Sequence, residues 1–201
     1  MQDYSQSGEQ PHILEAFGDK VGRFLDIGAC DGKLGSNSLA LVERGWSGVL
    51  VEASPRAFLK LQELHGNNPK LVLINAAVGL NTVLSPFWDG PGPALGYATT
   101  EGKNRAKWEH HCSFQNPFYL VTVSLHRLLS MVDPSNPFDF VSIDTEGTST
   151  DLFVAYPFRE PYPKVVCVEH DERIPECLAV AKSYQYREVA RNPQNLVLVR
   201  D

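Results

Sequence analysis

Cysteine is scarce in this sequence. Four cysteines occur among 201 residues, and no two of them form a Cys-x-x-Cys pair. This excludes a disulfide framework and a paired-cysteine zinc site. Cys30 and Cys167 lie in apolar runs, which is typical of buried thiols in a reducing compartment.

Long apolar runs are also missing. The longest, Leu71–Leu80, is interrupted by Asn75 and is far shorter than the roughly 20 residues that a transmembrane helix needs. The first residues, Met1–Ser5, carry neither the basic nor the apolar stretch of a secretory signal. We therefore expect a cytoplasmic protein that does not bind a membrane.

Positive charge is not concentrated in any segment. The chain has 18 Lys and Arg against 24 Asp and Glu, which gives a formal net charge of −6 at pH 7. Because nucleic-acid binding needs a contiguous basic face, we expect no nucleic-acid partner. The 15 Gly and 14 Pro follow no period, which excludes collagen-like and low-complexity chains. The length fits a single domain over residues 1–201.

The chain does contain an alternation of strand-like and helix-like segments. Apolar runs predict strands at 23–28, 48–52, 71–74, 119–123, 138–144 and 164–169. Helices are expected within 34–44, 54–66, 125–132, 148–158 and 175–183, and a closing antiparallel hairpin at 186–190 and 196–199. Continuous apolar strands indicate a sheet covered on both faces. We therefore predict a doubly wound, Rossmann-like α/β sheet, mostly parallel, with ligands at the carboxyl ends of its strands.

Residues 85–117 interrupt this regular pattern. They are rich in proline and glycine and show no sustained period. Irregular segments of this length inside a compact domain are usually functional, so we predict an insertion or lid over an acceptor site. Its aromatic and histidine side chains are candidates for stacking on a sugar: Trp88, Tyr97, Trp108, His110, His111 and Phe114.

The turn after the first strand reads Asp26-x-Gly28-x-x-x-Gly32. A dinucleotide fingerprint would need glycine at position 30, which is Cys. Acids such as Asp26 and Asp31 repel phosphate but attract a sulfonium or ammonium group. Glu52, at the end of the next strand, is placed to accept hydrogen bonds from ribose hydroxyls. This combination favours S-adenosylmethionine, which is cationic and contains a ribose but no phosphate.

Further segments extend this pattern along most of the chain: Tyr4-Ser5-Gln6-x-Gly8-Glu9, Phe24–Gly32, Ser36-Asn37-Ser38, Gly45–Glu52, Asn75–Gly79 and Phe138–Gly147. The most specific element is Ile143-Asp144-x-Glu146-Gly147. Together these segments resemble the FkbM-like class I methyltransferases. The resemblance implies S-adenosylmethionine as cofactor and O-methylation of a hydroxyl on a sugar, glycan or small natural product. It also implies these cofactor-binding residues: Gln6, Glu9, Asp26, Gly28, Ala29, Asp31, Gly32, Ser36, Asn37, Glu52, Ala53, Asn75, Ala76, Ala77 and Asp144.

Acidic residues and a histidine follow two later strands. Asp144 and Glu146 come after one strand, and Glu169 and His170 come at the end of the next. An alcohol becomes a good nucleophile when a base removes its proton, and His170, oriented by Asp144 or Glu146, is the predicted base. The rival hypothesis is a divalent metal held by Asp144, Glu146 and His170.

Two other functions stay open at this point. One is a dinucleotide-dependent oxidoreductase on a related sheet, which Cys30 in the glycine loop disfavours. The other is a non-catalytic cofactor-binding protein with the same fold, which the acids after the later strands disfavour. The expected partner is a small hydroxylated acceptor.

Overall fold

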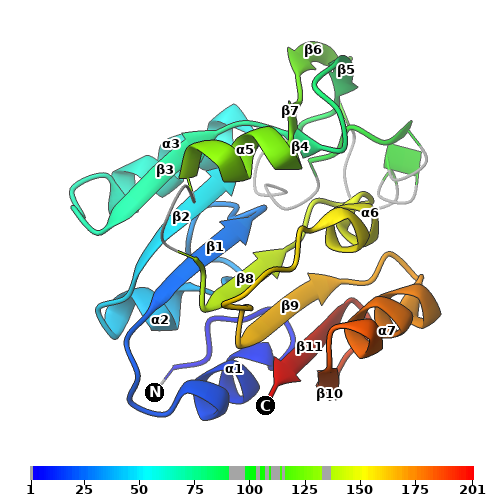
Figure 1. Ribbon diagram of the computed structural model, residues 1–201. Helices are drawn as coiled ribbons and strands as arrows, with labels where there is room; N and C mark the ends of the chain where they lie inside the picture. The colour runs from blue at the N-terminus through cyan, green and yellow to red at the C-terminus, as the bar shows by residue number, and fades with distance from the viewer. Residues whose placement is uncertain are drawn as a thin grey trace.

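The computed structural model describes residues 2–90, 98–102, 105–106, 109, 114, 116–132 and 137–201. Its centre is a seven-stranded sheet in the order β10-β11-β9-β8-β1-β2-β3 (Figure 1). The strands are β1 (Arg23–Ile27), β2 (Ser47–Glu52), β3 (Leu71–Asn75), β8 (Phe140–Ile143), β9 (Val165–Glu169), β10 (Tyr186–Arg191) and β11 (Asn195–Arg200).

The sheet is parallel from β3 to β9 and antiparallel at β11. Strand β11 lies between β9 and β10 and runs against both. This confirms the prediction of an α/β fold with a mostly parallel sheet and a C-terminal antiparallel hairpin. The parallel strands therefore end at the same edge of the sheet.

Helices cover both faces of the sheet (Figure 1). One face packs against α1 (Glu9–Phe17), α2 (Leu39–Glu43) and α3 (Pro55–His65), with Phe24 and Phe140 in the buried layer between. The other packs against α5 (Leu125–Val132), α6 (Ser149–Ala155) and α7 (Ile174–Ser183). The inner strands are apolar on both sides because both sides are buried.

Helix α2 is shorter than the predicted segment 34–44, because it begins at Leu39. Gly35 has a left-handed φ of 64°, which a helix does not contain. The Ser36 hydroxyl then accepts a hydrogen bond from the Leu39 amide at 3.0 Å. Helix α1 was not predicted from the sequence, although Ile13 and Phe17 place two buried apolar side chains four residues apart on one face.

Two small sheets lie outside the central one. They pair β4 (Val78–Gly79) with β7 (Val123–Ser124) and β5 (Leu84–Phe87) with β6 (Phe118–Val121). The predicted strand 119–123 is thus divided between two sheets. Figure 1 shows β5 and β6 projecting from the molecule. Within the residues described, no helix combines the length and apolar character required to cross a bilayer.

We predict that Gly48→Ala destabilises the fold by about 1–3 kcal/mol, the usual effect of overfilling a packed core. A Cβ at Gly48 would lie 2.5 Å from the Phe24 ring, which is completely buried. Gly79→Ala is the matched control, because its Cβ would meet its nearest neighbours at an ordinary 3.7 Å. Urea unfolding measures both variants, and equal stability would contradict the packing argument.

Candidate functional site

A cavity of about 720 Å³ opens at the carboxyl ends of β1, β2 and β8. Its described wall includes Gly28, Glu52 and Asp144, each at or just after the end of one of these strands. This is the edge at which doubly wound sheets bind ligands. The volume lies within the range of small-molecule and cofactor sites.

The turn after β1 brings two walls of the cavity together. Gly28 has a left-handed φ of 92°, and a Cβ there would overlap the Asp144 carbonyl oxygen. The amides of Gly28 and Ala29 both donate to the carbonyl of Val51 on β2, at 2.9 and 3.0 Å. The turn is therefore fixed between the ends of β2 and β8, and only glycine fits its first position.

Glu52 is a buried carboxylate at the cavity wall. Its two oxygens accept hydrogen bonds from the amides of Cys30 at 2.8 Å and Ser54 at 2.6 Å. Burial raises the pKa of Glu52 to about 7. The two hydrogen bonds lower the pKa, and the negative charge of Asp89 raises it further. The Asn75 side chain donates to the Glu52 carbonyl at 2.8 Å and so supports this end of β2.

Asp26 lies beneath the loop, outside the described lining of the cavity. One of its oxygens accepts a hydrogen bond from Ser38 at 2.6 Å. Burial raises the pKa of Asp26 to about 6, although hydrogen bonds from Ser38 and Ser142 oppose the rise. Asn37 donates to Ser142 at 3.3 Å in the same buried layer. These residues hold the segment between β1 and α2 in place.

The predicted cofactor residues divide into two groups. Those that line the cavity are Gln6, Gly28, Asp31, Glu52, Ala53, Ala76, Ala77 and Asp144. Those that the structure does not bring to the described lining are Glu9, Asp26, Ala29, Gly32, Ser36, Asn37 and Asn75. The second group supports the wall: Gly32, for example, packs against Leu61 and His65 so closely that a Cβ would not fit.

The turn after β8 carries an acidic cluster. Asp144, Glu146 and Glu169 each place one carboxylate oxygen within 4.8 Å of the others. Burial, followed by the charges of Glu169 and Glu146, raises the pKa of Asp144 well above its usual range, and Asp144 is hydrogen-bonded to Glu169. Ser149 donates to Glu169 at 2.8 Å and fixes that carboxylate. Burial and the neighbouring carboxylates therefore favour the protonated form of Asp144 beside Glu169.

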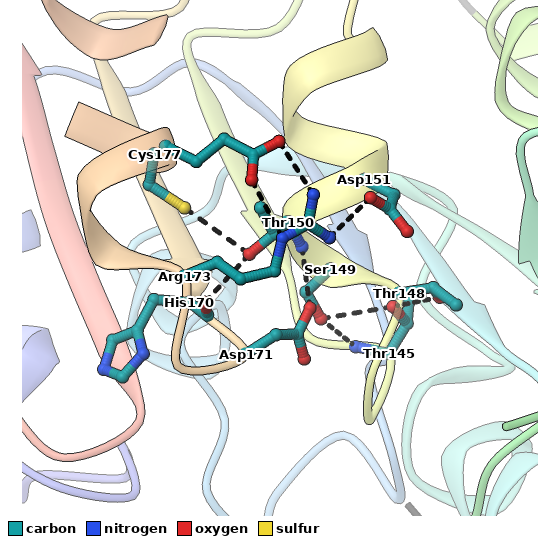
Figure 2. A network of polar contacts seen from close by, with 10 residues as sticks. Thr145, Thr148, Ser149, Thr150, Asp151, His170, Asp171, Arg173 and Cys177 are labelled. Atoms are coloured by element: carbon teal, nitrogen blue, oxygen red, sulfur yellow. Dashed lines mark hydrogen bonds and ion pairs between the residues drawn. The ribbon is translucent and has the colours of Figure 1, made fainter. Parts of the chain in front are cut away.

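His170 does not line the cavity within the described residues, so the structure does not bring its ring beside Asp144 and Glu146, and its role as base or metal ligand stays a prediction. Its Nε2 faces the Asn192 carbonyl at 3.3 Å and its Nδ1 accepts from the Glu172 amide at 3.2 Å. Figure 2 shows the ring turned away from Ser149 and Thr145. Strand β9 ends at Glu169, and His170 is the first residue of the turn that follows, so Glu169 reaches the acidic cluster and His170 does not. The predicted metal ligand set is therefore not assembled.

Sequence reasoning overlooked several residues of the site. Glu169, at the end of β9, belongs to the acidic cluster, although it is not part of the described lining of the cavity. Phe87, Ala98, Thr99 and Thr100 come from the predicted insertion and line the cavity. Four candidates for sugar stacking, Tyr97, Trp108, His110 and His111, lie outside the described residues. The prediction that 85–117 forms a lid stays a prediction.

We predict that the buried acids make the protein less stable as pH rises. The folded state keeps the Asp26 proton up to about pH 6, whereas an unfolded aspartate loses it near pH 4. The stabilisation is complete below the unfolded pKa and is lost as pH rises through 6. Asp26→Asn should therefore remove up to about 3 kcal/mol of the stability difference between acidic and alkaline pH.

Urea unfolding at pH 5 and pH 8 measures about half of this effect, about 1.4 kcal/mol, because the unfolded aspartate has already lost its proton at pH 5. Asp19→Asn is the matched control, because Asp19 is exposed in the turn after α1. A pH dependence as steep in Asp26→Asn as in the wild type would contradict the assignment.

Comparisons with known proteins identify the family of this chain. A sequence model of the methyltransferase FkbM domain matches residues 26–187, most of the chain. No curated protein matches this chain. Among solved structures, the crystal structure of methyltransferase FkbM from Methylobacillus flagellatus KT is similar, with 13% sequence identity and a TM-score of 0.48. The match covers 89% of this chain but 43% of that chain, so this chain spans less than half of that protein. The chain belongs to the FkbM methyltransferase family.

Proposed function

We propose that this protein is an S-adenosylmethionine-dependent O-methyltransferase that acts on a hydroxyl of a sugar, glycan or small natural product. The observation that carries the proposal is the cavity at the strand ends, with Glu52 on one side of the Gly28 turn and Asp144 on the other. Family membership supports methyl transfer. The donor and acceptor are our inference from the chemistry of the wall.

The donor groups of the wall fit S-adenosylmethionine. Glu52 is available to accept hydrogen bonds from ribose hydroxyls, because each carboxylate oxygen has a further lone pair beside the one its backbone amide uses. Ala53, Ala76 and Ala77 give an apolar wall for an adenine ring. Asp31 and Asp144 suit the cationic groups. When bound, the cofactor supplies an electrophilic methyl group.

The base in this proposal is the Asp144–Glu169 pair. Asp144 lines the cavity, and burial and the neighbouring charges raise its pKa, which makes its carboxylate a stronger base. Glu169 shares the proton, and Ser149 holds Glu169 in position. Glu146 adds negative charge beside them. This pair would accept the proton of a hydroxyl bound beside it and so make the hydroxyl oxygen a better nucleophile.

The alternative functions are less well supported. A dinucleotide-dependent oxidoreductase does not agree with membership of a methyltransferase family. A non-catalytic cofactor-binding protein would have no need of buried carboxylates that share a proton, because burying such charges is costly. A divalent metal is not part of the proposal, because the Asp144–Glu169 pair supplies the base.

We predict that S-adenosylhomocysteine raises the melting temperature, since a ligand that binds only the folded state stabilises it by mass action. Glu52→Gln should weaken that binding by about 1.5–3 kcal/mol, the value of a hydrogen bond to a charged group. Calorimetry measures the affinity, and Glu63→Gln on the exposed side of α3 is the control. No melting shift at millimolar ligand in the folded wild type would refute the cofactor assignment. NADH should give no shift.

We predict that Asp144→Asn lowers methyl transfer by about 10²–10⁴-fold, the typical contribution of a general base. A methyl-release screen of sugars and glycosides first identifies an acceptor. The wild-type rate should rise with pH through the raised pKa of the pair, because the base must lose its proton to act. Single-turnover rates across pH measure both effects.

His170→Gln is the matched control for this experiment. It should keep the wild-type rate, because its ring faces away from the cavity. A large loss in His170→Gln with little loss in Asp144→Asn would restore histidine as the base.

A further inference from the structure

Residues 2–8 precede α1 and form part of the cavity wall; we name this segment the N-terminal strap. Gln2, Asp3, Tyr4, Ser5 and Gln6 line the same cavity as Glu52 and Asp144. The strap therefore borders the proposed cofactor site, although it belongs to no strand of the central sheet.

The strap has few contacts of its own with the body of the protein. Its side chains are exposed or half-buried, so it gains little from apolar burial. Ser5 makes an isolated β-bridge with Gly35, and the Tyr4 hydroxyl donates to the exposed Glu43 at 2.7 Å. Gly8 has a left-handed φ of 88° and no atom within 4 Å of its Cβ position. The chain therefore turns between the strap and α1 at a residue that does not pack against a neighbour.

The first turn of α1 supplies the firm attachment. Glu9 and Gln10 are almost completely buried, with 1% and 3% of their surfaces exposed. Gln10 accepts a hydrogen bond from the Tyr4 amide at 2.9 Å and donates to the Gln2 carbonyl at 2.7 Å. Glu9 accepts one from the Ser7 amide at 2.8 Å.

Glu9 also reaches the opposite end of the chain. Its second oxygen accepts hydrogen bonds from the side-chain amides of Asn192 and Asn195, both at 2.7 Å. Asn195 begins β11 and pairs with Glu169 on β9. One buried carboxylate thus connects the strap, the β10–β11 turn and the strand that carries Glu169.

We propose that Glu9 is a positioning residue that holds the N-terminal strap against the cofactor cavity. The proposal rests on the proposed function for the identity of the ligand. Glu9 itself does not line the cavity within the described residues, and it acts on bound ligand through the strap. Release of the Ser7 hydrogen bond should open the strap and shorten the residence time of the cofactor product.

Two variants release the strap by different routes. The first releasing variant, Ser7→Pro, removes the backbone N–H that donates to Glu9. Its control is Ser7→Ala, which keeps this N–H. The second releasing variant is at Glu9. Glu9→Gln keeps one oxygen for Asn192 and Asn195 and turns an amide group towards Ser7. Ser7→Pro leaves the buried hydrogen bonds of Glu9 to Asn192 and Asn195 in place, so its melting temperature should stay close to that of the wild type. Glu9→Gln should lower the melting temperature, because a buried amide then faces the Ser7 amide and the bonds to the two asparagines lose their charge.

Amide hydrogen exchange and the dissociation rate of S-adenosylhomocysteine test the proposal. In Ser7→Pro and Glu9→Gln, the Tyr4 and Ser5 amides of the free protein should exchange about tenfold faster or more, and dissociation should accelerate similarly, because a hydrogen bond to a charged group is lost. Ser7→Ala should match the wild type in both measurements.

The possible outcomes separate this proposal from the cofactor assignment. Wild-type exchange at Tyr4 and Ser5 in both releasing variants would overturn it whether or not the ligand binds. Faster exchange with an unchanged dissociation rate would reduce Glu9 to a structural role and also overturn it. Failure of the wild type to bind S-adenosylhomocysteine would refute the proposed function, and exchange in the free protein would still test the strap attachment.

Discussion

The close approach of Gly28 to the Asp144 carbonyl determines the shape of the site. No side chain fits at Gly28, because a Cβ would overlap that oxygen, and the left-handed φ of 92° independently favours glycine. This contact brings the turn after β1 against the turn after β8. As a result, the glycine loop and the acidic turn form two walls of one cavity, although more than one hundred residues separate them in the chain.

Buried carboxylates concentrate at the same edge of the sheet. Burial raises the pKa of Asp26 to about 6 and that of Glu52 to about 7, and it raises the pKa of Asp144 well above its usual range. Each ionised form is therefore unfavourable in the free protein. A cationic ligand at this edge would offset part of that cost. These acids reduce the stability of the protein at neutral pH. They also make the cavity favourable for positive charge and favour a protonated carboxyl group at Asp144.

The first turn of α1 and the β10–β11 turn meet beside this edge. Glu9 in α1 accepts hydrogen bonds from Asn192 and Asn195 in the β10–β11 region. The same carboxylate accepts a hydrogen bond from the amide of Ser7 in the strap. The antiparallel β11 makes this possible, because it runs back from the cavity edge beside β9. Closure of the cavity by residues 2–8 thus depends on the C-terminal hairpin.

The sequence by itself determined the sheet, its buried strands and the residues at the carboxyl ends of those strands. Apolar runs are directly readable, and parallel strands end at one edge, so Gly28, Glu52 and Asp144 were predicted to lie near one another. Tertiary structure decided which face each neighbouring side chain occupies. Glu169 and His170 are adjacent in sequence, yet only Glu169 reaches the acidic cluster, because β9 ends at Glu169 and the chain turns at His170. The role of Glu9 was likewise beyond sequence reasoning, since its partners lie more than 180 residues away and only packing of α1 against the sheet brings them together.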